Sequence, residues 1–179
     1  MPVLISLLRG INVGGNKKIR MADLKDLYES LGFTKVKTLL QSGNVVFESQ
    51  THDSDKLTGQ IETAIEEHFG FQVRIIMRTG AELKAIIERN PFSDKALAEP
   101  SKLLVVFLLE ELDASKLDAA MEAYEGPEQL HLKGRELYIF YPEGMGRSKL
   151  DRTLGKVKMV NTGRNWNTVN KLLAIIEQM

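Results

Sequence analysis

The sequence predicts an α+β protein built from two ferredoxin-like subdomains with antiparallel sheets. In residues 1–90, segments with strand and helix periodicity follow one another in the order β-α-β-β-α-β, which is the split βαβ arrangement. Residues 102–179 begin again with a strand, a helix and a hairpin, and they end in a helix. Residues 91–101 contain prolines, alanines and a glutamate, and this composition predicts a linker between the two subdomains.

The first subdomain follows from local patterns. Val3 to Leu8 is almost entirely apolar, as in a central strand that is covered on both faces. Apolar residues recur at helical spacing from Met21 onward, and Gly32 is placed as a C′ cap of that helix. Alternating residues on both sides of Gln41–Asn44 predict a hairpin. The first and third strands should therefore lie at the centre of the sheet.

Later elements are assigned in the same way. A helical face from Leu57 to Phe69 ends at Gly70, and alternation from Phe71 to Met77 predicts the fourth strand. Further segments are predicted as a short helix at 81–88, a strand at 102–109, a helix at 117–124, a hairpin at 129–141 and a final helix with its apolar face at 169–176.

Composition excludes several functional classes. The chain has 179 residues and no cysteine, so disulfides, zinc ribbons and thiol catalysis are excluded. The apolar run after Met1 is short and meets Arg9, and no stretch approaches the roughly 18–20 apolar residues that cross a bilayer. We therefore expect a cytoplasmic protein that has no membrane partner. The oligomeric state stays open.

Formal net charge is zero, but the charges are unevenly distributed along the chain. Residues 9–20 contain four basic and no acidic residues, whereas residues 110–128 contain seven acidic residues and one lysine. A second basic stretch covers residues 143–164. The two basic stretches either form one positive site on a neutral protein or lie on separate solvated faces.

The glycine-rich turn that follows the first strand is the first candidate site. Free backbone N–H groups beside basic residues can hold an anion. Asn16 and Lys17 replace the Lys and Ser/Thr of a phosphate-binding P-loop, which argues against nucleotide hydrolysis. A non-hydrolytic anion site and a purely conformational turn both remain open. The candidate ligand residues here are Arg9, Asn12, Gly14 and Gly15.

Three other turns carry polar or basic side chains. The polar residues of the first of these turns, in the predicted hairpin, are common turn formers, and they could also hydrogen-bond a ligand. The second turn is glycine-flanked and basic, and the third precedes the final helix with a tryptophan that either stacks on a ligand or anchors packing. The candidate ligand residues are Gln41, Ser42 and Asn44 in the first of these turns, Arg147, Ser148 and Lys149 in the second, and Arg164, Trp166 and Asn167 in the third.

No catalytic pattern is present. The three histidines are scattered, and neither a zinc-protease nor a nucleophile-elbow motif occurs. Ser42 and Ser148 have no obvious catalytic base nearby in sequence. Catalytic residues and any cofactor therefore stay unknown, and no metal site is expected.

The motifs LRGINVGG, QSGNVVF, GRSKL and RNWNTV, together with the helix MADLKDLYESLGF, resemble the domain-of-unknown-function family sixteen-ninety-seven. The resemblance covers nearly the whole chain. It implies an α+β protein of two ferredoxin-like subdomains, and it implies no activity. The family's motif positions are Arg9, Gly10, Asn12, Gly14 and Gly15; Gln41 to Asn44; Gly146 to Lys149; and Arg164 to Thr168.

These features favour a binding protein whose turns converge between the subdomains on a basic, asparagine-rich cleft. The expected partner is a nucleotide, a phosphorylated small molecule or single-stranded nucleic acid. One alternative is an enzyme acting on a small anionic substrate through Ser42, Ser148 or Lys149. Another is a protein-interaction module in which the motifs are purely structural.

Overall fold

The structure, a computed structural model, describes all residues from Met1 to Met179. The chain divides into two compact units. The first unit consists of Met1–Ala85 and Lys171–Met179, and the second unit consists of Ile86–Asn170. This division differs from the expected boundaries, because the last nine residues group with the N-terminal part of the chain.

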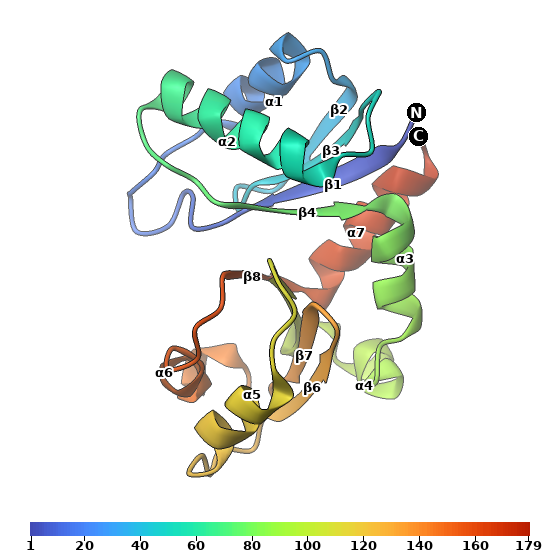
Figure 1. Ribbon diagram of the computed structural model, residues 1–179. Coiled ribbons are helices and arrows are strands. Elements are labelled where there is room, and N and C mark those ends of the chain that lie inside the picture. The colour runs from blue at the N-terminus through green and yellow to red at the C-terminus, as the bar shows by residue number, and fades with distance from the viewer. The chain divides into compact units, whose positions relative to one another are not determined.

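The first unit has a four-stranded sheet in the order β2-β3-β1-β4, and all neighbouring strands are antiparallel. Helices α1 and α2 lie together on one face of this sheet (Figure 1). The prediction that the first and third strands are central is confirmed. The elements are β1 (Val3–Leu8), α1 (Met21–Ser30), β2 (Thr34–Leu39), β3 (Asn44–Glu48), α2 (Ser54–Phe69), β4 (Ile75–Thr79) and α3 (Gly80–Glu88), whose last residues belong to the second unit.

Strand β1 is buried because its residues are almost all apolar. Leu4 and Leu8 belong to the core cluster under the two helices. Between them, Ser6 hydrogen-bonds the Tyr28 hydroxyl of α1 at 2.6 Å, and both side chains are fully buried. This pairing meets the requirement that a buried hydroxyl have a partner.

Helix α2 begins and ends where the sequence indicates. The Asp53 carboxylate accepts a hydrogen bond from the Lys56 amide at 3.0 Å, as an N-cap does. Gly70 ends the helix with φ of 82°, a left-handed conformation that glycine adopts without steric cost. Strand β4 starts at Ile75, four residues later than predicted, and its first amide donates to the Glu62 side chain at 2.8 Å.

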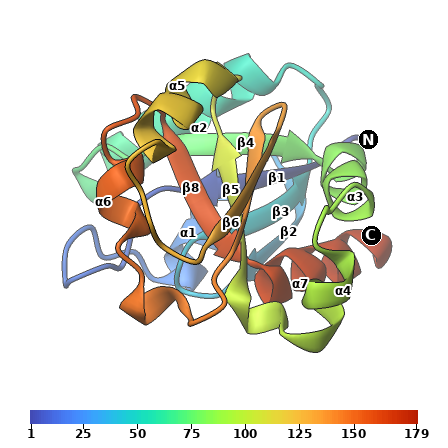
Figure 2. The ribbon, with the colours of Figure 1, turned by 90° about the horizontal axis from the view of Figure 1, so that it is seen from below.

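The second unit repeats the topology of the first, with the strand order β6-β7-β5-β8. Helices α5 and α6 lie side by side (Figure 2) and pack on one face of the sheet through a shared apolar cluster. Its elements are α4 (Ser93–Ala98), the 3-10 turn η1 (Pro100–Lys102), β5 (Leu103–Leu108), α5 (Ala114–Met121), β6 (Gln129–Lys133), β7 (Glu136–Phe140), the 3-10 turn η2 (Met145–Arg147), α6 (Leu150–Leu154), β8 (Asn161–Asn165) and α7 (Trp166–Glu177), which continues into the first unit.

Two parts of the second unit differ from the sequence prediction. The expected linker at 91–101 contains α4, which follows Phe92, and the Phe92 ring packs 6.1 Å from that of Phe140. Strand β8 was not predicted, because Asn161–Asn165 has no apolar alternation to reveal it. Pairing with β5 holds β8 in place, so tertiary contacts supply what local pattern lacks.

Candidate functional site

The loop between β1 and α1 contains a small hairpin. Val13 and Asn16 form an antiparallel bridge, and the Asn12 amide donates to the Lys17 carbonyl at 3.1 Å. Gly14 and Gly15 have φ of 61° and 78°, as a two-residue type I′ turn requires. The glycines therefore shape a hairpin turn, which favours the conformational turn over the anion site, and the backbone amide of Asn12 is used inside the hairpin.

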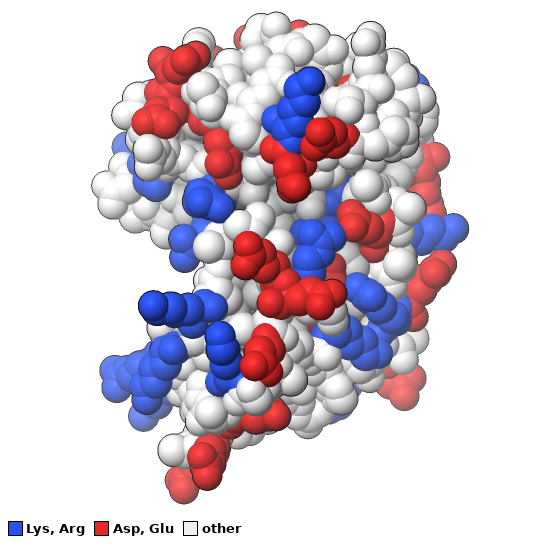
Figure 3. Space-filling view, viewed as in Figure 1, with Lys and Arg blue, Asp and Glu red and all other residues white.

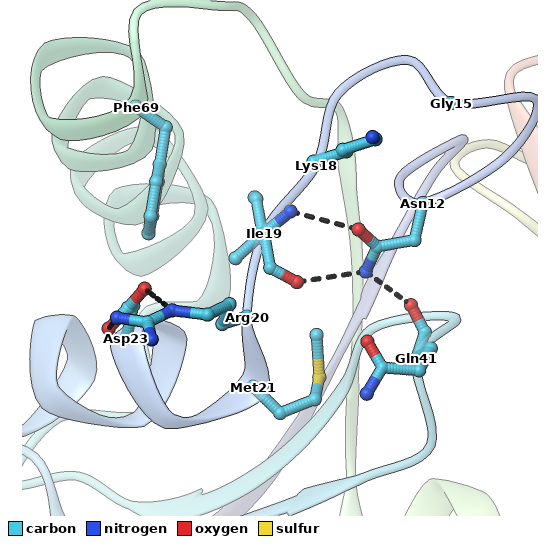
Figure 4. Close-up of a pocket in the computed structure, with 9 residues that line it drawn as sticks. All are labelled: Asn12, Gly15, Lys18, Ile19, Arg20, Met21, Asp23, Gln41 and Phe69. Carbon is cyan, nitrogen blue, oxygen red and sulfur yellow. Dashed lines mark hydrogen bonds and ion pairs between the residues drawn. The ribbon is translucent and has the colours of Figure 1, made fainter.

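Asn12 fixes the position of this loop. Its side-chain amide donates to the carbonyls of Ile19 at 3.0 Å and Gln41 at 2.7 Å, and its Oδ1 accepts from the Ile19 amide at 2.9 Å. These bonds close the loop on itself and tie it to the turn between β2 and β3 (Figure 4). Asn12 thus acts on the backbone, and both of its amide protons are already engaged.

A groove of about 940 Å³ opens beside the loop. One cation there is neutralised, because Arg20 donates to both carboxylate oxygens of Asp23 at 2.7 and 2.9 Å. The hydrogen bond from Arg20 holds the pKa of the Asp23 carboxyl below its usual value. Lys18 makes no hydrogen bond or ion pair. The lining residues are Asn12, Gly15, Lys18, Ile19, Arg20, Met21, Asp23, Gln41 and Phe69 (Figure 4).

The structure brings only some of the candidate residues of the first unit together. Asn12, Gly15 and Gln41 line the groove, whereas Arg9, Gly14, Ser42 and Asn44 do not. Asn44 is completely buried, and its amide donates to the Leu39 carbonyl at 2.7 Å and to the Ser42 hydroxyl at 3.1 Å. These contacts favour the turn-forming interpretation of Asn44.

A pocket of about 460 Å³ lies in the second unit, between the loop that precedes β6 and the segment leading into α6. Arg147, Ser148 and Lys149, three adjacent candidates, all line it. Lys and Arg side chains gather over α6 (Figure 3), beside acidic side chains over α5. The other lining residues are Tyr124, Glu125, Gly126, Pro127, Glu128, Glu143, Gly144, Arg152 and Thr153.

Three cations of this pocket are unpaired. Arg147, Lys149 and Arg152 are exposed, and none of their side chains makes a hydrogen bond or an ion pair. Carboxylates line the same pocket, yet none lies within ion-pair distance of these three groups. Their positive charge is therefore available to an anionic ligand.

The remaining candidates lie elsewhere in the second unit. Arg164 is buried and donates to the Thr162 hydroxyl at 2.6 Å and the Gly163 carbonyl at 2.9 Å; burial lowers its pKa to about 10. Trp166 is only 8% exposed at the start of α7, which favours the packing interpretation. Asn167 is exposed on the same helix, outside the pocket.

Several pocket residues were missed at the sequence level. Lys18 and Phe69 belong to the first groove, and Tyr124, Glu128 and Arg152 belong to the second pocket. At the sequence level, the stretch that contains Glu128 was noted only for its acidic charge. Only the fold brings this stretch to the loop that carries Arg147.

Neither a metal centre nor a membrane span is seen. No group of three or more His, Asp or Glu side chains is arranged to hold a metal ion. No helix combines the length and apolar character needed to cross a bilayer.

Comparisons with known proteins agree with the fold. The conserved bacterial protein SP0830 from Streptococcus pneumoniae has a similar structure, with a TM-score of 0.79, 27% sequence identity and coverage of 98% of each chain. No curated protein matches this chain. The family described as protein of unknown function, DUF1697, matches residues 1–138, so the match ends before the GRSKL and RNWNTV motifs. On this match over most of its length, the chain belongs to the DUF1697 family.

Proposed function

We propose that this protein binds a phosphate-bearing ligand, a nucleotide or a short single-stranded nucleic acid, in the pocket of the second unit. The observation that carries the proposal is the group of unpaired cations: Arg147, Lys149 and Arg152 line one pocket and have no protein partner. Guanidinium groups suit phosphate because their N–H donors match its oxygens in pairs. The pocket volume of about 460 Å³ lies within the range of small-molecule sites.

The groove of the first unit supports the same function less well. Its Arg20 is committed to Asp23, which leaves Lys18 as the cation without a partner there. Phe69 would offer a ring for base stacking. A single-stranded nucleic acid would use such a ring. The pocket of the second unit has more unpaired cations to hold a phosphate, three against one.

The test is a binding titration of the purified protein with adenosine monophosphate and with a short oligothymidylate. The double variant Arg147→Ala, Lys149→Ala removes two of the three cations. It should lower the affinity for the bound ligand by about tenfold or more, since each charge-assisted hydrogen bond contributes roughly 1.5–3 kcal/mol.

The matched control is Lys116→Ala, which removes an exposed positive charge of the second unit outside the pocket. It should leave affinity unchanged. If the double variant and the control lose affinity equally, the loss comes from the overall charge of the protein and not from the pocket. If the unmodified protein binds neither ligand, the proposal is wrong. Salt separates the ligands, because single-strand affinity falls with a log–log slope of about 0.7 per phosphate contact.

A further inference from the structure

The pocket of the second unit also contains a hydrogen-bonded trio of side chains. The Tyr124 hydroxyl donates to Glu128 Oε2 at 2.5 Å, and the Ser148 hydroxyl of the other loop lies beside this pair, where it acts to lower the pKa of both groups. Ser148 Oγ accepts a hydrogen bond from the Leu150 amide at 3.1 Å. The trio of Tyr124, Glu128 and Ser148 therefore links the loop before β6 to the segment before α6.

The trio presents acceptors to the pocket. The Tyr124 hydroxyl carries one proton, which it donates to Glu128, and Ser148 Oγ accepts one bond, from the Leu150 amide. An ionised carboxylate has about four acceptor positions, and these bonds do not fill them. Lone pairs on all three side chains thus remain for a ligand that donates, such as one carrying O–H groups.

The local backbone leaves room for this arrangement. A Cβ on Gly126 would collide with the Tyr124 hydroxyl and the Glu128 carboxylate, so the pair closes over a bare glycine. The pKa of Glu128 also fits an acceptor. Burial would raise it, but the hydrogen bonds from Ser148 and Tyr124 outweigh burial and hold it below its usual value of 4.5. A carboxylate this weakly basic is suited to accepting a ligand's hydrogen bonds and poorly suited to deprotonating Ser148.

The pocket therefore has two chemically different parts. Arg147, Lys149 and Arg152 supply donors and positive charge, and the trio supplies acceptors. We infer that the ligand is a sugar phosphate, or the sugar phosphate portion of a nucleotide, whose phosphate contacts the cations and whose hydroxyls donate to the trio. This inference rests on the proposed function. A hydroxyl is a neutral donor, so it can reach these acceptors without placing a further positive charge beside the three cations.

The experiment compares ribose 5-phosphate with n-propyl phosphate, which has the phosphate but no hydroxyl, by isothermal titration. The unmodified protein should bind ribose 5-phosphate at least about tenfold more tightly. The variant Glu128→Gln, which replaces a carboxylate acceptor by an amide, should lose most of that preference and keep its affinity for propyl phosphate.

The matched control is Glu125→Gln, the same change at an exposed residue of the same pocket that makes no hydrogen bond through its side chain. It should retain the preference for ribose 5-phosphate. If circular dichroism shows that Glu128→Gln does not fold, Tyr124→Phe takes its place, because it removes only the phenol oxygen.

Each other result overturns a defined statement. If both phosphates bind equally to the unmodified protein, the sugar inference fails and the proposed phosphate site stands. If neither binds, the proposed function fails as well. If Glu125→Gln loses the preference as fully as Glu128→Gln, the trio is not the recognition element. If ethanolamine phosphate binds as tightly as ribose 5-phosphate, the acceptors recognise an ammonium group and the hydroxyl assignment fails.

Discussion

At the scale of the residue, polar side chains in this protein often hydrogen-bond backbone groups. Asn12 satisfies the carbonyls of two separate segments and also accepts a backbone amide, all from a conformation with φ of 55°. Asparagine tolerates this left-handed region better than most residues. A motif of glycines and asparagine can therefore be distinctive and still have a structural role.

The variant Asn12→Ala tests this role. It removes three hydrogen bonds, leaves the Gln41 carbonyl without its donor and places alanine at positive φ. We expect a loss of about 2–3 kcal/mol in the free energy of unfolding, measured by urea denaturation. Asn16→Ala, an exposed asparagine of the same hairpin, should cost much less. A near-neutral Asn12→Ala would contradict the structural role.

At the scale of the element, the loop before β6 is held by the ionised carboxylate of Glu128. The pKa of Glu128 is lower in the folded protein than its usual 4.5, because Ser148 and Tyr124 donate to the charged form. A lowered pKa means that the folded state binds the proton less well than the unfolded chain does. Its contribution to stability is therefore present above about pH 4.5 and is lost as the pH falls through the folded value.

This linkage predicts a difference between variants as a function of pH. In urea titrations from pH 7 to pH 3, the unmodified protein should lose more stability than Glu128→Gln, whose side chain does not titrate. Glu125→Gln should follow the unmodified protein, since Glu125 makes no such hydrogen bonds. Parallel curves for the unmodified protein and Glu128→Gln would show that the carboxylate does not hold the loop.

At the scale of the whole molecule, the chain returns to its first unit at the end. Lys171–Met179 groups with the N-terminal residues, and the Lys35 ammonium donates to the Met179 carbonyl at 3.1 Å. Ile176 lies close to Gly80, at the start of α3, so that a Cβ on that glycine would approach the Ile176 methyl to 3.2 Å. The C-terminal residues are therefore part of the packing of the first unit.

A chain that ends at residue 170 tests this assignment. Loss of the terminal contacts should speed amide hydrogen exchange in β1 to β4 more than in β5 to β8, because exchange reports the local free energy of opening. The shortened chain should also unfold at a lower urea concentration. Faster exchange confined to β5–β8 would instead place the terminal residues in the second unit.

Local pattern by itself determined the two β-α-β-β segments, the caps at Gly32 and Gly70 and the central position of β1. Each of these features depends on residues that are adjacent or one helical or strand repeat apart, so a short stretch of sequence is enough to predict it. The matched family and the shared fold are consistent with those predictions. Among the candidate residues, the adjacency of Arg147, Ser148 and Lys149 was also visible in the sequence.

Tertiary structure alone decided which polar groups are free. Asn44, Arg164 and Trp166 look available in the sequence, but the fold buries all three. Strand β8 exists because β5 pairs with it, and Glu128 reaches Ser148 because two loops twenty residues apart meet. Burial and pairing depend on distant segments, and a sequence pattern read a few residues at a time contains no information about such distances.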